Sequence, residues 1–154
     1  MLILRLLDIL SIVLASLVMG IFWGPWLALT RSIRTLSPEV FLVVVHRLDT
    51  NLGRIMSVLF PVTLLSMIPV IVLTVGQPVS LTLEIAGFAL FLLALIVTAA
   101  VEVPIVTQIR GWTGVPLPAG WEQLRDRWVS FHQLRVIPGI LGVALLIAGA
   151  LWQS

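Results

Sequence analysis

The sequence predicts an all-α integral membrane protein that folds as a four-helix up-down-up-down bundle. Of its 154 residues, 60% are hydrophobic and only 10% are charged, which is far from the balance of soluble domains. The apolar residues also gather in four runs, each close to the roughly 20 residues that one helix needs to cross a bilayer. We therefore expect a single domain over residues 1–154, with the lipid bilayer as its surroundings and no separate soluble domain.

The predicted spans cover residues 6–29, 54–75, 81–105 and 130–152. The first is interpreted as an uncleaved anchor, because it is too long for a signal peptide and lacks a small-residue cleavage site. Trp23 and Trp26 near its exit are typical of a membrane-interface belt. Ser37-Pro38-Glu39 is typical of a helix start, with a hydroxyl cap, Pro at the first position and an acid in the first turn. It predicts an additional interfacial helical extension before the second span.

The remaining elements follow from proline, glycine and isolated acids. Pro61 and Pro69 are expected to bend or loosen the second span. The third span is apolar except for Glu84 near its start and Glu102 near its end. The stretch "RGWTGVPLPAGW" is dense in Gly and Pro and predicts a loop, after which the fourth helix runs to the end of the chain with an expected kink at Pro138-Gly139.

Arginine placement predicts the orientation. Four spans put both termini and the 76–80 turn on one side of the membrane and the two long connections on the other. Eight of the nine arginines fall on the side of the long connections: Arg31, Arg34, Arg47, Arg54, Arg110, Arg125, Arg127 and Arg135. The positive-inside rule then places those connections in the cytoplasm, in a bacterial inner membrane, with both termini outside. Because the arginines are few and interrupted by acids, no nucleic-acid partner is expected.

Alternating helix directions also bring polar residues to one membrane level. The residues concerned are Trp23, Trp26, His46, Asn51, Arg54, Glu102, Trp128, His132 and Arg135. The opposite half of the bundle holds only Arg5, Asp8, Gln77 and Glu84, which we expect to be scattered. A functional site is therefore predicted in the half that adjoins the long connections.

The segment "WEQLRDRWVSFHQLR" sharpens this prediction. At 100° per residue, one helix face of about 80° carries five of its side chains; these are Trp121, Arg125, Trp128, His132 and Arg135. Thr98 and Glu102 likewise share a face of the third span, as do His46, Thr50 and Arg54 at the second.

Plainer interpretations compete with a functional one. Arginine, histidine and tryptophan at this depth often contact lipid headgroups and serve as an interface belt. Glu102 lies inside a span, where an acid is costly unless it is paired, so an ion pair with Arg54 or Arg135 is expected. A metal site of His46, His132 and Glu102 is disfavoured, because no His-x-x-His or Glu-x-x-His pair is present. The chain has no cysteine, which excludes thiolate ligands.

The stretches "FWGPWLALTRSI", "EVPI" and "WEQLRDRWVSFHQLR" resemble the anthrone oxygenase-like family of small four-helix membrane proteins. The likeness covers nearly the whole chain, and its most specific part is Trp-x6-Trp-x3-His-x2-Arg at Trp121, Trp128, His132 and Arg135. Relatives carry Asn before the Val-Pro pair and two residues after its Pro, where this chain has Glu102 and Val106. A titratable group thus replaces a neutral amide.

The resemblance implies oxidation of a flat, apolar aromatic substrate, such as an anthrone or a hydroquinone-like compound, with O₂ and without metal or cofactor. His132 is the expected base, Arg135 the stabiliser of the developing oxyanion, and Glu102 the group that orients them. Trp121, Arg125, Trp128, Arg54, His46 and Trp23 are the expected substrate-binding residues. The alternative is a non-catalytic module that binds a quinone-like or lipid ligand or a partner membrane protein. Transport is less favoured, and association into a homo-oligomer is left open.

Overall fold

The computed structural model describes residues 2–153, and its regular elements there are all helical. The long helices are α1 (Leu2–Ala28), α3 (Arg54–Leu73), α4 (Pro78–Val97) and α6 (Trp121–Leu151). Two shorter α-helices, α2 (Pro38–Leu48) and α5 (Val103–Arg110), are joined to α3 and α4 by the π-helical turns η2 (Asp49–Gly53) and η3 (Thr98–Glu102). A 3-10 turn, η1 (Ile33–Thr35), lies between α1 and α2.

Four helical stretches are long and apolar enough to cross a membrane. They are Leu2–Ala28, Pro38–Leu73, Pro78–Arg110 and Trp121–Leu151. Many apolar side chains on their outer surfaces are exposed, which is the expected state of residues that face lipid tails. The predicted all-α membrane bundle is therefore confirmed, and the chain is an integral membrane protein.

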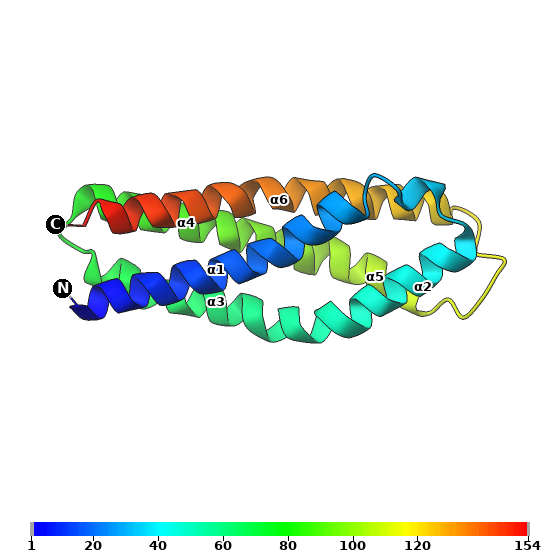
Figure 1. Ribbon diagram of the computed structural model, residues 1–154, viewed down its shortest axis with the longest axis horizontal. Coiled ribbons are helices and arrows are strands. Elements are labelled where there is room, and N and C mark those ends of the chain that lie inside the picture. The colour runs from blue at the N-terminus through cyan, green and yellow to red at the C-terminus, as the bar shows by residue number, and fades with distance from the viewer. Residues whose placement is uncertain (1, 154) are drawn as a thin grey trace.

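The four stretches lie side by side in an elongated bundle (Figure 1). Leu2, Gln153 and the turn at residues 74–77 lie at one end, which we call the terminal end; both long connections lie at the other, the loop end (Figure 1). α6 packs along α4 and α1, and α1 also packs along α3. This arrangement is the predicted up-down-up-down order.

Local sequence signals account for the helix boundaries. The Ser37 hydroxyl accepts a hydrogen bond from the backbone N–H of Val40 at 3.4 Å, and Pro38 follows as the first helical residue. The helical extension predicted before the second span is thus present as α2. At the turn between α3 and α4, Gly76 adopts a φ of 104°, a left-handed conformation that glycine takes without steric cost.

The irregular turns of the second and third spans do not coincide with the prolines of α3. α3 remains α-helical through Pro61 and Pro69, and α6 does so through Pro138. The widened π-helical turns lie instead at η2 and η3. In the third span the reason is local: Pro104 follows η3 and has no N–H to donate, so the preceding turn cannot keep its α-helical hydrogen bonds.

Two hydrophobic clusters fill the bundle. The larger one joins α1, α3, α4 and α6 and includes Phe22, Phe60, Phe91 and Leu146. The second lies at the loop end, where α2, α5 and α6 meet. α4 and α6 approach closely near Gly142, since a Cβ atom there would lie 2.7 Å from a ring carbon of Phe91. Members of both clusters line one cavity between the helices.

Candidate functional site

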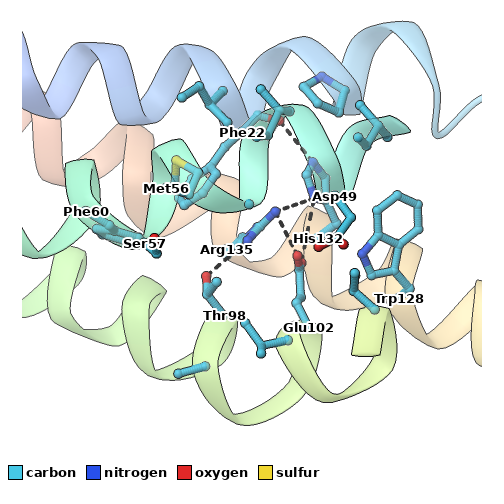
Figure 2. Close-up of a pocket in the computed structure, with 18 of the residues that line it drawn as sticks. Phe22, Asp49, Met56, Ser57, Phe60, Thr98, Glu102, Trp128, His132 and Arg135 are labelled. Carbon is cyan, nitrogen blue, oxygen red and sulfur yellow. Dashed lines mark hydrogen bonds and ion pairs between the residues drawn. The ribbon is translucent and has the colours of Figure 1, made fainter. Parts of the chain in front are cut away.

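A cavity of about 400 Å³ lies in the half of the bundle nearer the loop end. Side chains from α1, the second span, the third span and α6 all line it, and most of them are apolar (Figure 2). Its volume falls within the roughly 300–1,000 Å³ typical of small-molecule sites, which are mostly apolar with a few placed polar groups. The cavity is therefore large enough for an organic ligand.

Both π-helical turns form part of the cavity wall. η2 contributes Asp49, Leu52 and Gly53, and η3 contributes Thr98, Ala99 and Glu102. A π-helical turn holds one extra residue and rotates the side chains that follow it, and such turns are frequent at functional sites. The two departures from α-helical geometry in the membrane spans thus coincide with the same cavity.

Arg135 is the centre of a polar cluster on the cavity wall. Its Nη2 lies 2.7 Å from Glu102 Oε2, and its Nη1 donates to Thr98 Oγ1 at 3.0 Å. The guanidinium carbon also lies 4.3 Å from the ring centroid of Phe22. Figure 2 shows these side chains turned toward one another from α1, η3 and α6. The ion pair expected for Glu102 is confirmed, with Arg135 as its partner.

The hydrogen bonds of His132 define its tautomer. Its Nε2 lies 3.0 Å from the backbone carbonyl of Phe22, which can only accept, so Nε2 carries the proton. Its Nδ1 lies 2.8 Å from Arg135 Nη2, which can only donate, so Nδ1 offers its lone pair. The imidazole is therefore neutral and is held at both nitrogens.

One carboxylate oxygen of the cluster lacks a partner. Glu102 Oε1 is buried without a hydrogen bond and lies 3.6 Å from His132 Nδ1. Because the side chains of Glu102 and Arg135 are only 5% and 10% exposed, their opposite charges must offset each other's desolvation. A proton added to Nδ1 would find Glu102 Oε1 beside it.

The cavity reaches the loop end at a second ion pair. Arg110 donates from Nε and Nη2 to the two carboxylate oxygens of Asp49, at 2.8 Å each. Both residues line the cavity, and the Arg110 side chain is 60% exposed. This pair ties η2 to α5 at the wall of the cavity nearest to water.

Four of the nine predicted site residues line the cavity: Glu102, Trp128, His132 and Arg135. The Trp128 ring also packs on the His132 imidazole, with centroids 5.9 Å apart. Glu102 comes from the predicted face of the third span, and the other three come from the predicted face of α6. The bundle brings these two faces together.

The other five lie elsewhere. Trp121 packs on Phe41 of α2, and Arg125 stacks on Trp121, because α2 covers that part of the α6 face. His46 Nε2 lies 3.2 Å from the carbonyl oxygen of Ile109, whereas Arg54 is exposed. Trp23 is 39% exposed and packs on Trp26. None of these five residues lines the cavity, so the structure does not bring them together with the other four.

Sequence analysis missed three residues of the site: Phe22, Asp49 and Arg110. The Phe22 carbonyl fixes the histidine tautomer, and main-chain groups leave no signal in side-chain patterns. Asp49 and Arg110 are 61 residues apart in the sequence, and no spacing rule connects them. Thr98 was placed on the Glu102 face, but its bond to Arg135 could not be predicted.

Within residues 2–153, no three His, Asp or Glu side chains gather closely enough to hold a metal ion. Comparisons with protein-family models, with curated proteins and with solved structures found no match to this chain. The site and the fold together define a membrane-embedded four-helix protein with a mostly apolar cavity that carries a buried polar cluster on its wall. The resemblance to the anthrone oxygenase-like family stays a prediction.

Proposed function

We propose that this protein is a cofactor-independent membrane oxygenase. Its substrate would be a flat, apolar aromatic compound, anthrone- or hydroquinone-like, that partitions into the bilayer and reacts with O₂. The observation that supports this proposal most strongly is the position of Glu102, His132 and Arg135 on one wall of a mostly apolar cavity. Phe22, Phe60 and Trp128 offer aromatic surfaces against which such a ring system would pack.

For an anthrone, the reaction converts one ring CH₂ group and O₂ into a carbonyl group and water. A base removes one C–H proton, and the carbanion passes one electron to O₂, giving a carbon radical and superoxide. These combine through a new C–O bond, and return of the proton gives a hydroperoxide. Loss of water, which takes the remaining C–H hydrogen and breaks the O–O bond, leaves the carbonyl. No external reductant is needed.

His132 is the proposed base, acting through Nδ1. That lone pair accepts from Arg135 Nη2 in the structure, so the arginine must turn away before a proton can be taken. The substrate oxygen is the natural new acceptor for the freed N–H, and there the guanidinium would stabilise the developing oxyanion. Binding of the substrate oxygen and release of the base are then the same event.

Glu102 would stabilise the imidazolium that forms. Once Nδ1 is protonated, Glu102 Oε1 at 3.6 Å is the nearest acceptor, and it has no other partner. The Phe22 carbonyl keeps Nε2 protonated throughout, which directs the chemistry to Nδ1. In the serine hydrolases a carboxylate orients the base from its other ring nitrogen. Here the Phe22 carbonyl holds that position, and Glu102 lies beside the nitrogen that takes the proton.

The test is O₂ consumption by the purified protein in detergent with an anthrone as the probe. His132→Ala is expected to abolish the protein-dependent rate. His46→Ala is the matched control, because His46 is the other histidine of the chain and lies outside the cavity; its rate should equal that of the wild type. Equal turnover by the His132→Ala protein, with an unchanged melting temperature, would remove the base assignment.

A binding module is the second candidate, and one observation favours it. Both nitrogens of His132 are already engaged, so the cluster could serve only to recognise a polar group on a quinone-like or lipid ligand. Such a module would retain a quinone probe through purification and show no O₂ consumption with any aromatic substrate. A partner membrane protein would instead bind the outer surface of the bundle, and the cavity would then stay free of ligand.

We also propose a bacterial inner membrane as the location, with the loop end in the cytoplasm and the terminal end outside. The support is the arginine distribution, since eight of nine lie on the side of the long connections. Cysteine substitutions at exposed loop-end and terminal-end positions, labelled with an impermeant thiol reagent in whole cells, would test it. Labelling of the loop-end positions in whole cells would show that the loop end lies outside and would contradict the proposed orientation.

A further inference from the structure

A second buried polar group lies in the opposite half of the bundle, near the terminal end. The sequence suggested that Asp8 and Glu84 are scattered there. The structure buries both instead: Asp8 is 4% exposed and Glu84 is 1% exposed. Asp8 comes from the second turn of α1 and Glu84 from the second turn of α4.

The two carboxyl groups lie beside neighbouring positions at the end of α6 and are poorly satisfied. Glu84 lies against Gly149, and Asp8 lies beside Gln153, four residues further along the chain. Asp8 Oδ1, Asp8 Oδ2 and Glu84 Oε1 are all buried without a hydrogen-bond partner, although the Gln153 side chain lies beside Asp8. Gly149 makes room on α6, because a Cβ atom there would lie 2.5 Å from Glu84 Oε1. The fold therefore accommodates this carboxyl group closely.

No basic side chain offsets these acids within residues 2–153. Arg5, on the same helix as Asp8, is exposed and forms no ion pair with it. α6 carries no basic residue after Arg135, and neither α4 nor α3 beyond Arg54 carries any. Two like charges buried together without a counter-ion are strongly unfavourable in a membrane. One carboxyl group of such a pair takes up a proton.

We propose that Asp8 and Glu84 form a proton-binding site, in which Glu84 is protonated at neutral pH and donates a hydrogen bond to the Asp8 carboxylate. A proton suits the site better than a metal ion, because no third carboxylate or imidazole approaches the pair in the described chain. Only about 9 Å of helix separates Asp8 from Leu2, so protons can reach the site from the water at the terminal end.

Infrared spectroscopy of the protein in lipid vesicles at pH 7 tests this site. The wild type should show the C=O stretch of a protonated carboxyl group, and the Asp8→Asn/Glu84→Gln double variant should lack it. Glu102→Gln is the matched control and should keep the band, because Glu102 is paired with Arg135. A wild type without the band, or a double variant that retains it, overturns the proposal.

Two further measurements keep the test decisive. If the double variant does not fold, the single Asp8→Asn variant should retain the band at a shifted frequency, since its hydrogen-bond acceptor has changed; an unshifted band contradicts the shared proton. A cation in place of the proton would make wild-type melting depend on Na⁺ in exchange for choline. We expect no such dependence, and a Na⁺-dependent melting temperature would contradict the proton site. Both results are independent of oxygenase activity.

Discussion

Removing the charge of Glu102 is the perturbation whose cost the structure defines best. Glu102→Gln keeps the size of the side chain but leaves the Arg135 guanidinium, 2.7 Å away, buried without its counter-ion. Breaking a buried pair by removing one partner typically costs about 3–5 kcal/mol. Because the amide oxygen of Gln can still accept a hydrogen bond, we expect a value near the lower limit, about 3 kcal/mol. For a chain of this size that corresponds to roughly 6–12 °C in melting temperature.

The assay is thermal unfolding in detergent, with Glu122→Gln as the matched control. Glu122 lies exposed at the start of α6, so its substitution should change stability by less than about 0.5 kcal/mol. Glu102→Gln/Arg135→Met removes both charges and should be more stable than Glu102→Gln alone, because no unpaired charge stays buried. The reasoning is refuted if the two Glu→Gln variants melt together, or if the double variant is no better than the single one.

Three other predictions follow from packing and from the cavity. Gly142→Ala should destabilise the protein by about 1–3 kcal/mol, because its Cβ would overlap Phe91, whereas Gly20→Ala, with open space around it, should not; thermal melting of the two variants compares them. Asp49→Asn should cost no more than about 1 kcal/mol in the same assay, since its arginine partner is largely exposed. Ala99→Trp should block binding of a fluorescent aromatic probe to the cavity, whereas Ala100→Trp, at the next position and outside the cavity lining, should leave binding unchanged.

The fold was largely predictable because membrane spans need only length and apolar composition. The start of α2 was also predictable, because Ser37-Pro38-Glu39 is a local signal for a helix start, and the arginines mark the two long connections. The π-helical turns were not predictable, since the turn in the third span depends on how that helix accommodates Pro104 and the turn in the second span has no proline beside it. The prolines of the second span predicted a bend or loosening at Pro61 and Pro69 instead.

The site was predictable only where a buried charge required a partner. Glu102, His132 and Arg135 stood out because such residues are expensive inside a span. Periodicity also placed Trp121 and Arg125 on the same face, but it could not show that α2 covers that part of α6. Asp8 and Glu84 were overlooked because a pair formed between helices 76 residues apart carries no sequence pattern.

The central claim is that His132 takes a proton from the bound substrate. Anaerobic exchange of the anthrone C–H hydrogens in D₂O, followed by proton NMR, measures that step apart from the reaction with O₂. The wild type and His46→Ala should both accelerate exchange above the rate in detergent alone, and His132→Ala should not. Exchange by His132→Ala at the wild-type rate, or no acceleration by the wild type, would contradict the account.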